Sequence, residues 1–165
     1  QVAADLKRSL PNLEQFATLS PVPGFRPWLA KTTAGHADEP LVARLDDEHW
    51  WKGSDAPALQ AMLMRRVVEY FRHARNGSGR PFDPVARFHL GNGARLERVN
   101  WLADLSENGL RQSAGIMVNY LYDLDSIEEN HEAFAHRGEL ATGEPFQTMA
   151  ASMTSTQPSS GVKTR

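Results

Sequence analysis

Cysteine is absent from the sequence of 165 residues. A chain without cysteine forms no disulfide bonds, no zinc site with thiolate ligands and no thiol nucleophile. This absence is consistent with a reducing compartment, and no secretory signal peptide is visible. We therefore expect a cytoplasmic location.

An excess of charge of one sign is also missing. The sequence has 18 basic and 20 acidic side chains, for a net charge of −2. Nucleic-acid and membrane-surface binders usually carry a basic excess, and no run approaches the roughly 18 apolar residues of a membrane span. We expect neither nucleic acid nor membrane as a partner.

Several short catalytic motifs are lacking as well. The sequence contains no Gly-x-Ser-x-Gly elbow, no phosphate loop of the Gly-x4-Gly-Lys-Ser/Thr type and no His-Glu-x-x-His pair. None of its histidine pairs has a metal-ligand spacing on a recognisable helix. We therefore expect no metal site.

The hydrophobic pattern predicts strands interleaved with helices, which is typical of an α/β or mixed α+β domain. Residues 20–32 contain three prolines and a glycine, which predicts a stiff loop or a loop with a helical turn. Residues 84–102 fit a short helix followed by a strand, or alternatively two strands around Asn92-Gly93. The other expected elements are a helix from residue 1 to about 11, a strand over 14–20, helices over 56–75, from Ser106 and over 125–138, and a strand over 115–124.

The two ends of the chain have different patterns. The first residue is Gln1, and the sequence opens inside a helical pattern with no N-cap before it. We expect a fragment that begins within an element, although a processed start is the alternative. Residues 144–165 are rich in serine and threonine, which predicts a disordered tail after a domain over 1–143.

Two residues are candidates for chemistry. Ser20 ends the strand over 14–20 and is followed by prolines that restrict the backbone, so its hydroxyl is either fixed for catalysis or simply begins a turn. His89 lies between apolar residues and beside two glycines. It is either a proton donor or acceptor near neutral pH or a histidine held by a structural hydrogen bond.

Three blocks of the sequence, TLSPVPGF, PVARFHLGNGARLERVNWLADLS and SAGIMVNYLYDL, resemble the catalytic domain of the malonyl-CoA decarboxylases. The similarity runs from Gln1 to about Gly143. It implies a fold similar to the Gcn5-related N-acetyltransferases and the conversion of malonyl-CoA to acetyl-CoA and CO2. By the same resemblance, Ser20 and His89 form the catalytic pair and Tyr122 supports them, with Tyr120 on the same predicted strand face.

The resemblance also implies what else the enzyme needs. No cofactor is expected, since CoA is part of the substrate, malonyl-CoA. A helical N-terminal domain, the loop that holds the CoA pyrophosphate and a glutamate of the catalytic site would precede Gln1, and the full-length protein would be a homotetramer. The alternatives are an acyltransferase of the same fold and an inactive CoA-binding remnant.

Overall fold

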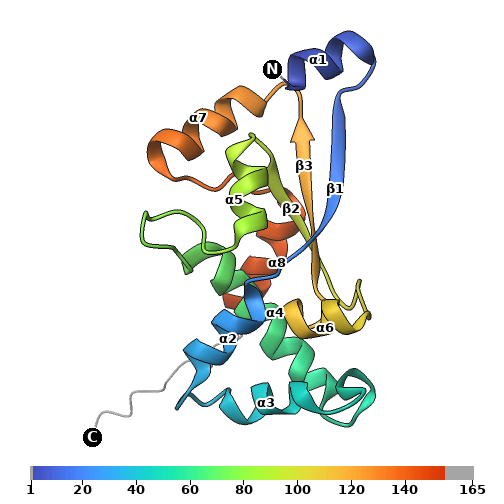
Figure 1. Ribbon diagram of the computed structural model, residues 1–165, viewed down its shortest axis with the longest axis vertical. Helices are drawn as coiled ribbons and strands as arrows, with labels where there is room; N and C mark the ends of the chain where they lie inside the picture. The colour runs from blue at the N-terminus through green and yellow to red at the C-terminus, as the bar shows by residue number, and fades with distance from the viewer. Residues whose placement is uncertain (1, 155–165) are drawn as a thin grey trace, which may run out of the picture.

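The computed structural model describes residues 2–154, which fold as strands and helices around a hydrophobic core (Figure 1). The helices are α1 Val2–Ser9, α2 Phe25–Thr33, α3 Glu39–Ala43, α4 Ala56–His73, α5 Pro84–Gly91, α6 Glu107–Ser113, α7 Ile127–Arg137 and α8 Glu144–Thr154, with the short 3-10 helices η1 Arg44–Asp46 and η2 Trp50–Lys52. The strands are β1 Gln15–Pro21, β2 Arg95–Asn100 and β3 Met117–Asp123. The mixed α/β class predicted from the sequence is confirmed.

The strands form one antiparallel sheet in the order β1-β3-β2. Successive side chains of a strand point to opposite faces, and the residues Val118, Tyr120 and Tyr122 of β3 are all buried on one of them. The register places Phe16 opposite Tyr122 and Ser20 opposite Val118. Strands β1 and β3 therefore contribute neighbouring side chains to the same inner face.

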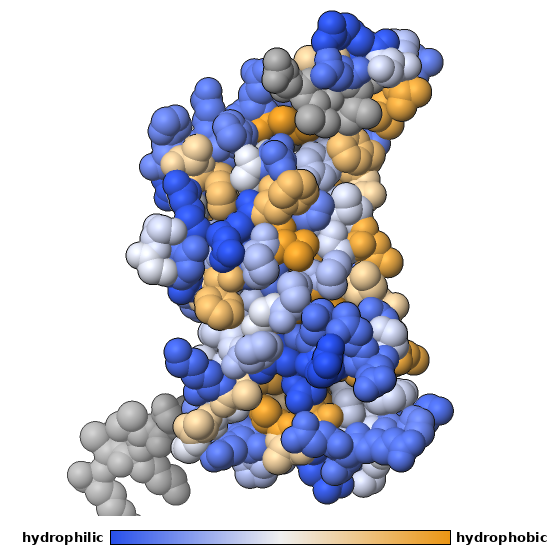
Figure 2. Space-filling view, in the orientation of Figure 1, coloured by the Kyte–Doolittle hydropathy of each residue, from blue (hydrophilic) through white to orange (hydrophobic). Residues whose placement is uncertain are grey.

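Strand β1 lies at an edge of this sheet (Figure 1). In the described part of the chain only β3 pairs with it. Figure 2 shows apolar side chains along the side of the molecule where β1 runs, and Leu19 of this strand is 56% exposed. The inner face of β1 carries the buried or half-buried Phe16, Thr18 and Ser20, whereas its outer face is exposed and partly apolar.

Helix α4 is the longest helix described, and it packs against α2, α3 and α8. Pro57 lies in its first turn, where the missing N–H has no helical acceptor. Its buried apolar residues are Leu59, Met62, Leu63, Val67, Val68, Tyr70 and Phe71. The predicted helix over 56–75 is therefore confirmed.

Residues 84–100 form a helix and then a strand, as preferred from the sequence, and the hairpin alternative around Asn92-Gly93 is wrong. The side chain of Asp83 caps α5 and Pro84 occupies its first turn. Gly93 has a φ of 87°, which favours glycine, and a Cβ there would lie 2.3 Å from the carbonyl oxygen of Ile127. The Asn-Gly pair thus makes a tight connection from helix to strand.

The prediction of a stiff loop, or of a loop with a helical turn, over residues 20–32 needs correction, since the segment from Phe25 onward is the longer helix α2. Pro27 lies within the first turn of the helix, where a proline removes no internal hydrogen bond. Phe25 and Leu29 are completely buried on one side of α2. Packing of these two side chains into the core fixes the helix.

The predicted disordered tail over 144–165 is also corrected in part. Residues Glu144–Thr154 form helix α8, with Phe146 and Ala150 each 1% exposed. The Phe146 ring packs edge-on against that of Phe71 in α4. Met149 and Met153 recur at helical spacing with Phe146 and Ala150 and pack against the same core. Residues 155–165 of the predicted tail lie outside the described residues.

Candidate active site

Strand β1 holds Ser20 on the inner face of the sheet. The side chains of Phe16, Thr18 and Ser20 alternate with exposed neighbours, as the strand period requires. Ser20 is 5% exposed, and its Oγ lies 3.0 Å from Oγ1 of Thr18. Val22, just beyond the strand, is completely buried and anchors the chain where it leaves the sheet. The Ser20 hydroxyl is therefore held in a defined position.

Helix α5 brings His89 to this serine. His89 Nε2 lies 3.2 Å from Ser20 Oγ, although the two residues are 69 positions apart in the sequence. The helix is started by the Asp83 cap earlier in the same segment, and the buried residues Ala86 and Leu90 pack one of its faces into the core. The structure thus brings together the two residues that the sequence singled out.

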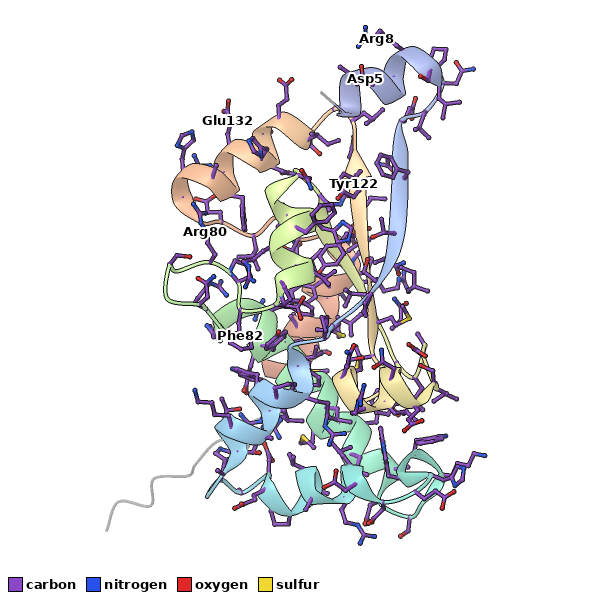
Figure 3. All side chains as sticks on the ribbon, in the orientation of Figure 1. Asp5, Arg8, Arg80, Phe82, Tyr122 and Glu132 are labelled. Atoms are coloured by element: carbon purple, nitrogen blue, oxygen red, sulfur yellow. The ribbon has the colours of Figure 1, made fainter. Side chains whose placement is uncertain are left out.

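Strand β3 contributes two tyrosines that contact His89 differently. Tyr122 Oη lies 2.7 Å from His89 Nδ1, and Figure 3 shows Tyr122 between β3 and α5. The Tyr120 ring stacks on the imidazole instead, with centroids 4.5 Å apart and planes 20° from parallel. The buried Tyr120 hydroxyl has no hydrogen-bond partner within residues 2–154. Of the two neighbouring tyrosines, the hydrogen bond to the histidine falls on Tyr122.

Burial shifts the pKa values of these groups in a consistent way. Desolvation lowers the pKa of His89, which favours the neutral ring. Desolvation raises the pKa of Tyr122, and with a smaller effect of the Asp83 carboxylate it raises that of Tyr120 well above its usual value. Near neutral pH the row of Ser20, His89 and Tyr122 is therefore uncharged. In a neutral imidazole one ring nitrogen donates a hydrogen bond and the other accepts one.

Sequence reasoning missed other residues of the site. Thr18 contacts the Ser20 hydroxyl, and the alternation of β1 is the signal that could have found it. Phe16 stacks on Tyr122 with ring centroids 4.7 Å apart and planes 3° from parallel, which holds the phenol in place. Asp83 stands before Pro84 as a helix start would, but no sequence signal connects it to the strand that carries the serine.

Other kinds of site were also sought in residues 2–154. No three side chains of His, Asp or Glu come together there as a set that could hold a metal ion. No helix within the same range is long and apolar enough to cross a membrane.

Comparison with known protein families shows to which family the chain belongs. The family model described as the malonyl-CoA decarboxylase C-terminal domain matches residues 1–160. The chain belongs to this family. The resemblance found in three sequence blocks therefore extends over nearly the whole chain.

Curated malonyl-CoA decarboxylases give the same result. The chain is 32% identical to the mitochondrial malonyl-CoA decarboxylase of Rattus norvegicus over 92% of its own length. It is 32% identical to the mitochondrial malonyl-CoA decarboxylase of the goose Anser anser anser over 81% of its length. These alignments cover 36% and 32% of the two relatives, so the chain spans about a third of their length.

Solved structures of malonyl-CoA decarboxylases share the fold. The crystal structure of the Rhodopseudomonas palustris protein matches with a TM-score of 0.78 at 46% identity, over 90% of this chain and 36% of that one. The crystal structure of the Agrobacterium vitis protein also matches with a TM-score of 0.78 at 46% identity, over 91% of this chain and 39% of that one. The arrangement of β1, α5 and β3 around the candidate site is thus set within a fold seen in this family.

Proposed function

We propose that the protein containing this chain is a malonyl-CoA decarboxylase, and that Ser20, His89 and Tyr122 serve its reaction. The observation that carries the proposal is the row of hydrogen-bonding atoms from Ser20 Oγ through both nitrogens of His89 to Tyr122 Oη. Membership of the family supports the substrate, malonyl-CoA, and the product, acetyl-CoA. The chain supplies this part of the site, and other parts of the enzyme would hold the rest of the CoA.

Decarboxylation breaks the bond between the malonyl α-carbon and its carboxylate. The electron pair passes to the α-carbon and the thioester oxygen as an enolate, and CO2 leaves. The thioester carbonyl accepts these electrons itself, so no metal or organic cofactor is needed for this step. Ser20 would lie against the carboxylate or the thioester oxygen. A hydrogen-bond donor at a developing oxyanion contributes about 10²–10³-fold in rate.

The enolate must then receive a proton. His89 donates it from Nε2 to the α-carbon, while the Tyr122 hydroxyl passes its own proton to Nδ1, and solvent returns a proton to Tyr122. The reaction therefore takes up one proton for each CO2 released. The raised pKa of Tyr122 keeps the phenol protonated in the resting site, where it can donate a hydrogen bond to Nδ1, and its proton moves only as Nε2 gives up its own. A general acid positioned in this way contributes roughly 10²–10⁴-fold.

Three further properties belong to the proposal. The antiparallel sheet with α5 against it is compatible with an acetyltransferase-like fold. A homotetramer is expected for the intact protein. The names of the rat and goose relatives place those proteins in mitochondria, so cell fractionation should distinguish that location from the predicted cytoplasmic one.

The test uses the intact protein that contains this chain and malonyl-CoA labelled in the free carboxylate. Released CO2 and acetyl-CoA are measured for the wild type, for Ser20→Ala and for His89→Asn. The matched controls are Ser54→Ala and His73→Asn, because both of these residues are exposed.

We expect the wild type and both controls to release CO2 and the two site variants to lose activity. We expect losses of about 10²–10³-fold for Ser20→Ala and roughly 10²–10⁴-fold for His89→Asn. A wild type that transfers its acyl group only to an acceptor, without CO2, is an acyltransferase and refutes the proposal. Wild-type turnover in either site variant refutes the role given to that residue.

A further inference from the structure

Asp83 is a buried carboxylate that the proposed reaction does not use. It is 1% exposed, and each of its oxygens accepts two hydrogen bonds. Oδ1 accepts the backbone N–H groups of Val85 and Ala86, at 2.9 and 3.0 Å, and so caps α5. Oδ2 accepts the backbone N–H of Gly24 at 3.2 Å and the hydroxyl of Tyr70 at 2.9 Å. Every lone-pair direction of the carboxylate is thus occupied.

These four bonds join the two segments that carry the proposed catalytic residues. Gly24 lies just beyond the end of β1, the strand that holds Ser20. The capped helix α5 carries His89. Tyr70 is 2% exposed within α4 and ties the carboxylate to the core. Asp83 is therefore the point where the serine segment, the histidine helix and the core helix meet.

The contact at Gly24 leaves no room for a side chain. A Cβ there would lie 2.3 Å from Tyr70 Oη and 3.4 Å from Asp83 Oδ2. The backbone at Gly24 has a φ of −84° and a ψ of −7°, which any residue adopts. Close approach to the Tyr70 hydroxyl, and not an unusual backbone angle, is therefore what requires glycine at this position.

We propose that Asp83, through Gly24 and Tyr70, is a positioning residue that sets the distance between Ser20 and His89. This inference rests on the proposed function, since it concerns the geometry of the same reaction. A displacement of about 1 Å between groups that must act together can lower a rate by roughly 10²-fold. The 3.2 Å contact between Ser20 Oγ and His89 Nε2 leaves little room for such a displacement.

The substitution Asp83→Asn separates the two roles of this carboxylate, which are to cap α5 through Oδ1 and to hold Gly24 and Tyr70 through Oδ2. Asparagine keeps an oxygen for the helix cap, and it is itself a favoured N-cap residue. It places an NH2 group where Oδ2 accepted hydrogen bonds, so that the Gly24 N–H faces another donor. The matched control is Asp38→Asn, which makes the same chemical change at a carboxylate that is 9% exposed and bound to Arg66 instead of α5.

In the intact protein, we expect Asp83→Asn to lower kcat by about 10²-fold with little change in KM. Asp38→Asn should lower the melting temperature and leave kcat unchanged. If Asp83 affected only the stability of the fold, Asp83→Asn and Asp38→Asn would have the same effect on kcat. If it has a positioning role, only Asp83→Asn lowers kcat. A wild type without decarboxylase activity refutes the proposed function. An active wild type with unchanged kcat in Asp83→Asn refutes the positioning role and leaves the function standing.

A second set of variants keeps the inference testable if Asp83→Asn fails to fold. Gly24→Ala should lower kcat because its methyl group meets the Tyr70 hydroxyl. Tyr70→Phe removes that hydroxyl, so the double variant should be no slower than Tyr70→Phe alone. Such a rescue shows that the loss in Gly24→Ala arises from this one contact. Unchanged kcat in Gly24→Ala, or a double variant whose losses simply multiply, refutes the inference.

Discussion

Replacing Tyr122 by phenylalanine removes one hydroxyl from the candidate site and little else. That hydroxyl lies 2.7 Å from His89 Nδ1. The ring that remains keeps its stacking on Phe16, at 4.7 Å between centroids. The variant therefore tests the hydrogen bond to the imidazole separately from the packing of the strand.

The size of the effect follows from the burial of the histidine. Without the phenol, Nδ1 of a partly buried ring loses its partner, which costs about 1–3 kcal/mol. If the whole loss falls on the transition state, kcat drops by roughly 5- to 150-fold, because each 1.36 kcal/mol is tenfold in rate. KM should change little, since Tyr122 acts through His89 and not on the substrate.

Tyr120→Phe is the matched control. It removes a hydroxyl that has no hydrogen-bond partner in the described part of the chain, and it keeps the ring that stacks on His89. Steady-state release of CO2 from malonyl-CoA should give a reduced kcat for Tyr122→Phe and wild-type kcat for Tyr120→Phe. If the two variants behave alike, or if Tyr120→Phe is the slower one, the assignment of Tyr122 is refuted.

Three further predictions concern pH and stability. Burial lowers the pKa of His89, so kcat/KM should be level at neutral pH and fall only as the pH drops through this lowered value, where the protonated ring can no longer accept from the phenol. A pH–rate profile that falls above neutrality instead would contradict this. Asp38→Ala should lower the free energy of unfolding by about 1–3 kcal/mol in urea titrations, because it removes one of the two carboxylates paired with the buried guanidinium of Arg66 and leaves only that of Glu69. Phe146→Ala should lower the free energy of unfolding by about 3–5 kcal/mol, because it leaves a cavity in the core. The exposed control Thr148→Ala should change this free energy little. Equal changes in the two variants would show that α8 adds nothing to the core.

The elements with a strong period could be predicted from the sequence. Helix α4 and strand β3 carry apolar residues at regular spacing, and both were predicted close to their observed bounds. Helix α2 was missed because Pro21 and Pro23 before it and Pro27 within it indicate a loop, whereas a proline in the first turn removes no internal hydrogen bond. Helix α8 was missed because serine and threonine dominate the composition of residues 144–165 as a whole, although Phe146 packs against Phe71 in the core.

The residues of the candidate site also fall into those that could be predicted from the sequence and those that could not. Ser20, His89 and Tyr122 were predicted from the family resemblance, and the structure brings their polar atoms together. The support around them could not be predicted, because Asp83 meets Gly24 across 59 residues and no local pattern records that contact. Contacts of this kind follow from the packing of whole helices and strands, which local sequence patterns do not show.

The pairing of β1 with β3 shapes how the chain must fold. Asn119 donates from its side chain to the carbonyl oxygen of Thr18 across 101 residues, and β2 also pairs with β3. At synthesis rates of about 5–20 residues per second, the first strand waits roughly 5–20 s for its partner. Throughout that interval the edge of β1 that β3 later covers is open to other chains. Because β3 is the strand that joins β1 to β2 in this sheet, the inner face that holds Ser20 is completed only after β3 is made.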